Sequence, residues 1–318
     1  MHVVVYLPLL ASAALGASGP YLSRRMPPAT AVRLLAVGAF VVALATGFTL
    51  SVVAFLLLAR LPWLARVGHW SAAALQAADP LPALVGPALG IGVVVLAGMA
   101  VRGAVQGGRD LWAAQAACRH LRGDAAGLVV VDDARAEAFA VPGITGRVVV
   151  STAMLRALPA PERRVLLAHE ASHLRHRHYL YVLAVELAAA ANPLLRPLAS
   201  AIRAGVERWA DEDAAALVGD RRVAARALAR AGLARAAHRV TPQPPGPLDG
   251  LAAVALGVAG SPIITRVQAL LAPPPGRRRL LALAVASIVV CAVMASLEVR
   301  HDTETAFEHA QTDYHATR

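Results

Sequence analysis

Long apolar runs without a charged side chain are the main pattern of this chain. Four of them are at or near the length of about 20 residues that crosses a lipid bilayer as a helix: Val3–Ser23, Leu34–Ala59, Pro80–Val101 and Leu280–Leu297. We expect each run to be a transmembrane helix. Residues 1–101 then hold three helices with short loops, residues 102–279 form a polar domain with its core at 125–220, and residues 298–318 form a short polar tail.

Arginine residues are distributed unequally around these runs. Most of them flank either the turn between the first two runs or the polar domain: Arg24, Arg25, Arg33, Arg102, Arg109 and Arg277–Arg279. The tail after Glu298 is acidic instead. Because cytoplasmic loops of membrane proteins carry an excess of positive side chains, we expect both termini to lie outside and the polar domain to lie in the cytoplasm.

Short β-branched runs and helix signals alternate inside the polar domain. Gly127–Asp132 and Arg147–Ser151 are rich in valine and predict two strands, with turn residues at Val141-Pro142-Gly143 between them. A helix is expected to begin at Pro159 and to run to about His178. The fold class that follows is a mainly α membrane protein with an α+β domain that contains a small β-sheet.

The apolar segment that follows this helix fits three different structures. Tyr179–Ala191 carries only one charge, Glu186, and ends at Asn192-Pro193, so it could be a buried helix, an interfacial helix or a fifth span. The remaining expected elements are two helices and a Pro-rich linker: Ala199–Val218, Arg221–His238 and Thr241–Asp249.

The composition supports a membrane protein and argues against nucleic-acid binding. Hydrophobic residues make up 57% of the 318-residue chain and charged residues only 16%, with a mean hydropathy of +0.56. The net charge of +11 comes from arginine alone, and no basic patch is interleaved with aromatic residues. Cys118 and Cys291 are not part of a C-x-x-C pair, so we expect buried free thiols.

One motif carries chemistry. His169-Glu170-Ala171-Ser172-His173 is an uninterrupted H-E-x-x-H pattern, and on a helix His169 and His173 share one face. Both imidazoles can then reach one Zn²⁺ ion, while Glu170 holds the attacking water as a general base. Such a five-residue pattern also arises by chance, so a third ligand is needed to support it.

Glu207 is the best candidate for that ligand. Catalytic zinc usually has three protein ligands, and Glu207 shares a helix face with Asp211, four residues later. Glu207 could bind the metal while Asp211 accepts the distal N–H of a histidine ligand. The alternative, a solvated acidic face, is less favoured once the H-E-x-x-H motif is considered.

Several other polar residues have weaker cases. His176 and His178 are interpreted as part of an interfacial helix surface, and Glu186 as a rival third ligand of lower weight. No oxyanion-stabilising residue can be identified, although three side chains near the motif are candidates: Arg203, Arg208 and His176. The histidines of the acidic tail are expected to be solvated: His301, His309 and His315.

Taken together, these motifs resemble the membrane gluzincin metallopeptidases. The similarity covers about residues 125–220 and rests on three further segments besides H-E-x-x-H: Ala138–Gly143, Val148–Ser151 and Glu207-x-x-Ala210-Asp211. The families concerned are the HtpX and CAAX prenyl protease type and the BlaR/MecR antirepressor type, and the short four-span layout is closer to the latter. Glu137 and Ala171-Ser172 depart from the usual pattern without removing a ligand.

The resemblance implies roles for particular residues. His169, His173 and Glu207 would bind Zn²⁺, Glu170 would be the catalytic base and Asp211 the partner of a ligand histidine. The strand Val148–Ser151 would be the edge that pairs with an extended peptide substrate.

The expected function is therefore a membrane-embedded zinc-dependent endopeptidase in contact with the lipid bilayer. Its protein or peptide substrate could be a transcriptional repressor or a set of membrane proteins under quality control. A catalytically silent zinc-binding sensor or scaffold is the alternative from another class. Residues 298–318 are too few for the penicillin-binding sensor domain of the beta-lactam receptors, so none is expected.

Overall fold

A computed structural model describes residues 4–77, 85–120, 123–124, 127–144, 146–239, 262–276 and 278–316. The Pro-rich segment Thr241–Asp249 lies outside these residues, as do Arg277, the first residue of the first apolar run and the start of the third run.

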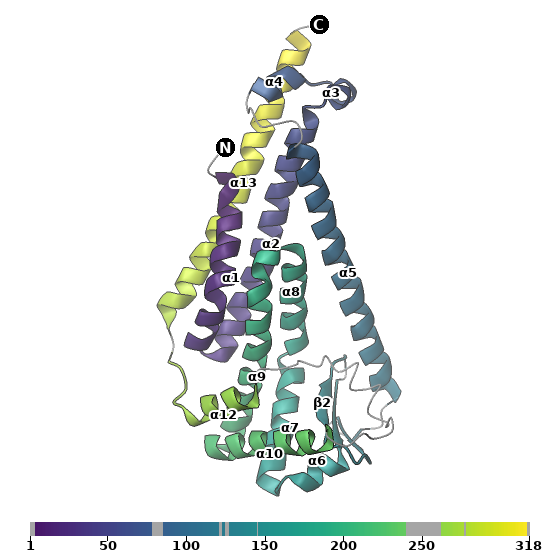
Figure 1. The fold of residues 1–318 in the computed structure, drawn as a ribbon, viewed down its shortest axis with the longest axis vertical. Helices are drawn as coiled ribbons and strands as arrows, with labels where there is room; N and C mark the ends of the chain where they lie inside the picture. Colours follow the sequence, from purple (N-terminus) through teal and green to yellow (C-terminus); the bar gives the residue numbers. More distant parts are fainter. Residues whose placement is uncertain are drawn as a thin grey trace.

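Long helices form at all four predicted apolar runs. They are α1 (Leu7–Arg25, preceded by the short 3₁₀ turn Val4–Tyr6), α2 (Pro28–Ala59), α5 (Val85–His120) and α13 (Arg279–Ala316). Within the described residues, these four are long and apolar enough to cross a membrane. Figure 1 shows α1, α2 and α13 side by side, whereas α5 leans away from them toward the β-sheet. The segment after residue 297, expected to be a short polar tail, is instead the last part of helix α13, which runs to Ala316.

The end of the bundle that carries the C-terminus is covered by two short helices. These are α3 (Pro62–Gly68), which follows the end of α2, and α4 (Ala72–Ala77), which lies against the last part of α13 (Figure 1). The Trp70 indole donates to the carbonyl of Ala59 at 2.8 Å, and its ring packs edge-on against Phe307. Aromatic contacts and a backbone bond from Ser71 to Ala310 thus tie α2 to α13 at this end.

The sheet has three strands, one more than predicted. β1 (Leu128–Val131) and β3 (Arg147–Ser151) match the expected positions, and β2 (Ala138–Val141) is additional. The order is β1-β3-β2, with β1 parallel and β2 antiparallel to β3. Since β3 is in the centre with both sides paired, the prediction that Val148–Ser151 is the free edge for a substrate is wrong. β2 is the edge strand on that side.

Six helices complete the described part of the polar region. They are α6 (Thr152–Ala157), α7 (Ala160–Arg175), α8 (His178–Ala191), α9 (Arg196–Val218), α10 (Arg221–Arg239) and α12 (Ile263–Leu271). The helix predicted to run to His178 ends at Arg175 instead, because Arg177 is in the left-handed conformation with φ 51°. The chain therefore turns between α7 and α8, and His178 begins a new helix.

Helices α8 and α9 form a hairpin that rises into the bundle of apolar helices (Figure 1). The segment Tyr179–Ala191 is helical: α8 has 14 residues, fewer than the four long apolar helices, and buries Val185, Ala188 and Ala189, which agrees with the buried-helix alternative. These side chains share one hydrophobic cluster with residues of α1, α2 and α9. The hairpin is thus part of the bundle core.

Polar contacts hold the tip of this hairpin against α1. The Asn192 amide donates to the Ser12 hydroxyl at 2.8 Å, and Ser12 also lies 2.9 Å from the Thr46 hydroxyl of α2. All three side chains are buried. Next to them, Gly16 of α1 allows the backbone of Leu194 to approach so closely that a Cβ on Gly16 would lie 2.0 Å from the Leu194 carbonyl oxygen.

This close approach makes the Gly16→Ala variant informative. The added methyl group would overlap backbone, so the hairpin tip would have to move away from α1, at a cost of about 1–3 kcal/mol by analogy with overpacked cores. We expect a lower midpoint of thermal unfolding for the full chain in detergent. Gly47→Ala is the matched control, since a Cβ there meets nothing within 4 Å. Equal midpoints for both variants would contradict this packing.

Candidate metal centre

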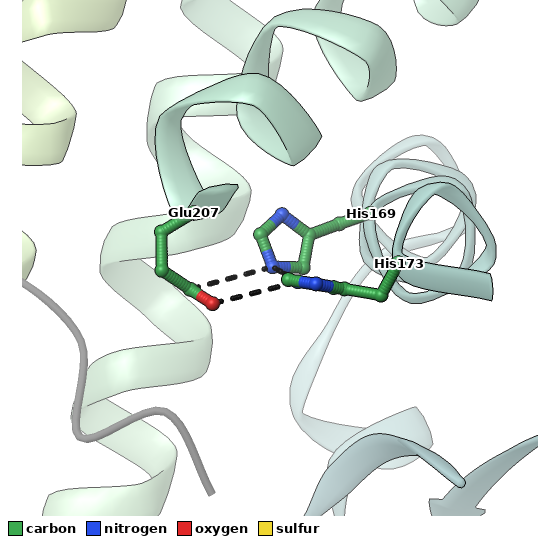
Figure 2. A group of neighbouring side chains, drawn as sticks. All are labelled: His169, His173 and Glu207. Atoms are coloured by element: carbon green, nitrogen blue, oxygen red, sulfur yellow. Dashed lines mark hydrogen bonds and ion pairs between the residues drawn. The ribbon is translucent and has the colours of Figure 1, made fainter. Parts of the chain in front are cut away.

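Three of the predicted ligand side chains meet between α7 and α9. His169 and His173 project from one face of α7, one turn apart, and Glu207 faces them from α9 (Figure 2). The Nε2 atoms of the two histidines are 3.3 Å apart. The Glu207 carboxylate oxygens lie 3.7 Å from Nε2 of His169 and 3.5 Å from Nε2 of His173.

These separations fit a tetrahedral metal ion. Zinc bonds of about 2.0–2.1 Å at tetrahedral angles put two ligand atoms about 3.3–3.4 Å apart. The two histidine nitrogens, 3.3 Å apart, match that value, and one oxygen of the Glu207 carboxylate faces each of them at 3.7 Å (Oε2 to His169) and 3.5 Å (Oε1 to His173). The donor set, two imidazole nitrogens and one carboxylate, is also one that catalytic zinc uses. Among the described residues, His169, His173 and Glu207 form a group that could hold a metal ion.

Asp211 lies behind one of the histidines. Its Oδ1 atom is 3.0 Å from Nδ1 of His169, so the carboxylate accepts the proton that this nitrogen carries and leaves Nε2 facing Glu207. The position of Asp211, one helical turn after Glu207, corresponds to the arrangement expected from the sequence. A solvated acidic face does not describe these two residues, because both carboxylates are buried.

A cavity of about 410 Å³ opens beside this group. Glu170 lines it together with His169, His173 and Glu207, and its side chain is buried. The edge strand β2 forms another wall through Ala138, Phe139 and Ala140. A peptide lying in this cavity would therefore be close both to Glu170 and to the outer edge of strand β2.

Arg266 is the residue of the site that sequence reasoning missed. It comes from α12 and is 7% exposed. Its guanidinium donates twice to Asp211, at 2.8 and 2.7 Å, and its Nη1 atom lies 2.7 Å from Oε2 of Glu207. In the sequence it is the single charged residue of Ile263–Leu271, and nothing there links it to Asp211, 55 positions earlier.

The charges in the site depend on one another. Burial alone would raise the pKa of Glu207 and of Asp211, but hydrogen bonds from His169 and Arg266, with the charge of Arg266, lower both. Burial lowers the pKa of His169, yet hydrogen bonds to Asp211 and Glu207 outweigh it and raise this pKa to about 10. Burial, and then the charge of His169, lower the pKa of His173. The two carboxylates thus remain anionic, and Arg266 and His169 balance their charge.

The remaining predicted candidates lie outside this group. Glu186 pairs with Arg203 on the hairpin and is not close enough to share a metal with the histidines. Arg208 donates to the carbonyl of Ser23 at 3.3 Å, and His176 lies 2.8 Å from Asp213. None of the three proposed oxyanion residues lines the cavity: Arg203, Arg208 and His176. Both cysteines are free, but only Cys118 is buried, so the expectation for Cys291 is wrong.

His178 also differs from its predicted environment. The sequence pattern predicts that His178 lies on an interfacial helix surface, whereas its side chain is only 2% exposed. Its Nδ1 atom lies 3.0 Å from Nδ1 of His173. The left-handed turn at Arg177 brings it back toward the end of α7, a change of direction that the helix pattern does not reveal.

A comparison with protein families supports a metallopeptidase. Residues 112–202 match the model of Peptidase family M48, which is consistent with the resemblance to metallopeptidases of the HtpX and BlaR/MecR type. The matched segment contains the three strands, α7 and α8, and it ends before Glu207 and Asp211. The chain has no match among curated proteins, and none among solved structures.

Removing Arg266 should destabilise the protein strongly. Arg266→Ala would leave two buried carboxylates without their cation, and breaking a buried ion pair from one side costs about 3–5 kcal/mol. We expect a large drop in the unfolding midpoint of the full chain in the presence of a chelator. Arg300→Ala is the control, because Arg300 pairs with Glu304 at the surface and such pairs contribute less than about 1 kcal/mol. Similar midpoints for the two variants would show that Arg266 does not neutralise the site.

Proposed function

We propose that this chain is a membrane-embedded, zinc-dependent endopeptidase whose active site is the group His169, His173, Glu207 and Glu170. The observation that carries the proposal is the convergence of ligand atoms from His169, His173 and Glu207, all within 4.8 Å of one another, in a cavity that Glu170 also lines. The match of residues 112–202 to a metallopeptidase family supports it independently.

The chain's own residues account for most of the chemistry. His169, His173 and Glu207 would hold the metal, which when bound polarises a peptide carbonyl and makes water more acidic. Glu170 accepts a proton from the attacking water and delivers it to the nitrogen of the leaving amine. Asp211 and Arg266 keep His169 and Glu207 in place, because each carboxylate is held by Arg266 and Asp211 also binds His169.

A substrate peptide would pair with β2 in an extended conformation. The N–H of Ser151 donates to the carbonyl of Glu137, so Glu137, Phe139 and Val141 face β3 and the residues between them face away. The backbone groups of Ala138 and Ala140 are thus directed toward the cavity side, and Arg235 already donates to the Ala138 carbonyl at 2.6 Å. Pairing of this kind gives affinity through the main chain with little dependence on side chains.

The surroundings of the site favour a place at the inner surface of the membrane. The α8–α9 hairpin is buried among the apolar helices, and Arg208 of α9 contacts the end of α1 beside Arg24 and Arg25. Positive charge at that end supports a cytoplasmic location for the site. Substrates reached from there include a transcriptional repressor and the cytoplasmic segments of membrane proteins.

The Glu170→Gln variant separates a working peptidase from a silent zinc-binding sensor. We expect this variant to retain zinc and to lose cleavage of casein or of itself, by about 10²–10⁴-fold, since it lacks the proton acceptor. Zinc content by atomic absorption and cleavage with and without chelator are the measurements. Full cleavage by Glu170→Gln would remove Glu170 from its role.

A matched control uses the other glutamate that was considered near the motif. Glu186→Gln should cleave as well as the unaltered protein, because Glu186 pairs with Arg203 outside the cavity. An unaltered protein that binds zinc and never cleaves any substrate offered would instead support the sensor function.

Pairing along β2 predicts a specific effect of proline. Ala140→Pro removes an N–H that faces the cavity and not β3, so the sheet should keep its register while the substrate loses a partner. We expect a higher KM, or a lower kcat/KM, for peptide substrates, with little change in unfolding midpoint. Phe139→Pro is the contrasting variant, because it removes a bond to β3 and should destabilise the domain. Unchanged kinetics in Ala140→Pro would exclude this binding mode.

A further inference from the structure

The second ligand histidine has a partner that is itself a histidine. Nδ1 of His173 lies 3.0 Å from Nδ1 of His178, which is a hydrogen-bond distance between two ring nitrogens. His169 has a carboxylate, Asp211, in the corresponding position. Both ligand histidines are thus held through Nδ1, and both direct Nε2 toward Glu207.

The direction of this hydrogen bond follows from the chemistry of imidazole. A histidine that binds a metal through Nε2 carries its proton on Nδ1, so His173 must donate to His178. Nδ1 of His178 must then be free of a proton, and the proton of its neutral ring must be on Nε2. That Nε2 atom is buried and has no hydrogen-bond partner among the described residues.

The ring of His178 is held in this orientation by packing. It is 2% exposed and lies against Trp209, with ring centroids 4.6 Å apart, and against His176 at 5.7 Å. Trp209 is covered in turn by the guanidinium of Arg33, 4.6 Å from the ring centroid. This packing keeps Nδ1 of His178 aimed at His173, while its Nε2 atom has no hydrogen-bond partner among the described residues.

We infer that His178 is a positioning residue that accepts the Nδ1 proton of His173 and so presents Nε2 of His173 to the metal. The inference rests on the proposed function, since it requires His173 to be a ligand. A neutral acceptor at this place adds no fourth carboxylate to a site that already contains Glu207, Asp211 and Glu170. The two ligand histidines therefore differ: His169 is backed by an anion and His173 by a neutral ring.

Two substitutions of similar size test whether residue 178 has to accept a hydrogen bond from His173. His178→Leu fills similar space without an acceptor, whereas His178→Asn can place its Oδ1 atom where Nδ1 was. The full chain in detergent would be titrated with zinc against a chromophoric chelator. We expect His178→Leu to bind zinc about 10–100-fold more weakly, as for other lost partners of ligand histidines, and His178→Asn to recover most of the affinity. His176→Leu, which also removes a ring packed on Trp209, should bind zinc normally.

The outcomes distinguish this inference from the proposed function. Failure of the unaltered protein to bind zinc would refute the proposed function itself. If the unaltered protein binds zinc and His178→Leu binds it equally well, or if His178→Asn is as weak as His178→Leu, the positioning role is refuted.

A second measurement applies even if His178→Leu does not fold. Nitrogen-15 NMR of histidine-labelled, zinc-loaded protein reports which ring nitrogen carries the proton. We expect a neutral His178 with its proton on Nε2, identified by the signal that His178→Asn loses. A proton on Nδ1 of His178 would overturn the assignment.

Discussion

The site depends on keeping two buried carboxylates ionised on one face of α9. Glu207 and Asp211 are one turn apart, and burial by itself would drive both toward their neutral forms. Arg266 prevents this by contacting both, and His169 supplies the second stabilising contact. Two carboxylates can stay ionised next to an apolar bundle because Arg266 and His169 balance their negative charge within the protein itself. The last described helix of the polar region, α12, is therefore as necessary to the site as the motif on α7.

The sequence predicted the parts of this site that follow a regular repeat. Helical spacing placed His169 beside His173 and Glu207 beside Asp211, and long uncharged runs located all four apolar helices. Contacts that depend on how elements meet were not predictable. Arg266 reaches Glu207 from α12, and the separation of the two residues along the chain does not indicate that they meet. A single arginine among uncharged residues is also common in helices that bind no carboxylate. The turn at Arg177, which needs a left-handed non-glycine residue, interrupts a pattern that otherwise reads as continuous helix.

Strand β2 was not predicted for a similar reason. Valine-rich β1 and β3 were evident, whereas β2 is the four-residue segment Ala138–Val141, which contains two alanines and adjoins a Pro-Gly turn. Its strand conformation comes from pairing with β3, so it could be recognised only with its neighbour in place. Because β2 is an edge strand, the strand proposed to pair with a substrate is also the one that its own residue types predict least well.

The α8–α9 hairpin has a consequence for what can be isolated from this protein. Its apolar side chains form one cluster with α1 and α2, including Val185, Leu198, Ile202, Leu35 and Val42. The helix that presents Glu207 is therefore packed, over its first half, against the long apolar helices α1 and α2. A fragment cut at residues 102 and 279 would separate the two halves of that cluster and expose its apolar surface to water. The long apolar helices and the candidate metal centre thus share one core, so neither can be isolated intact without the other.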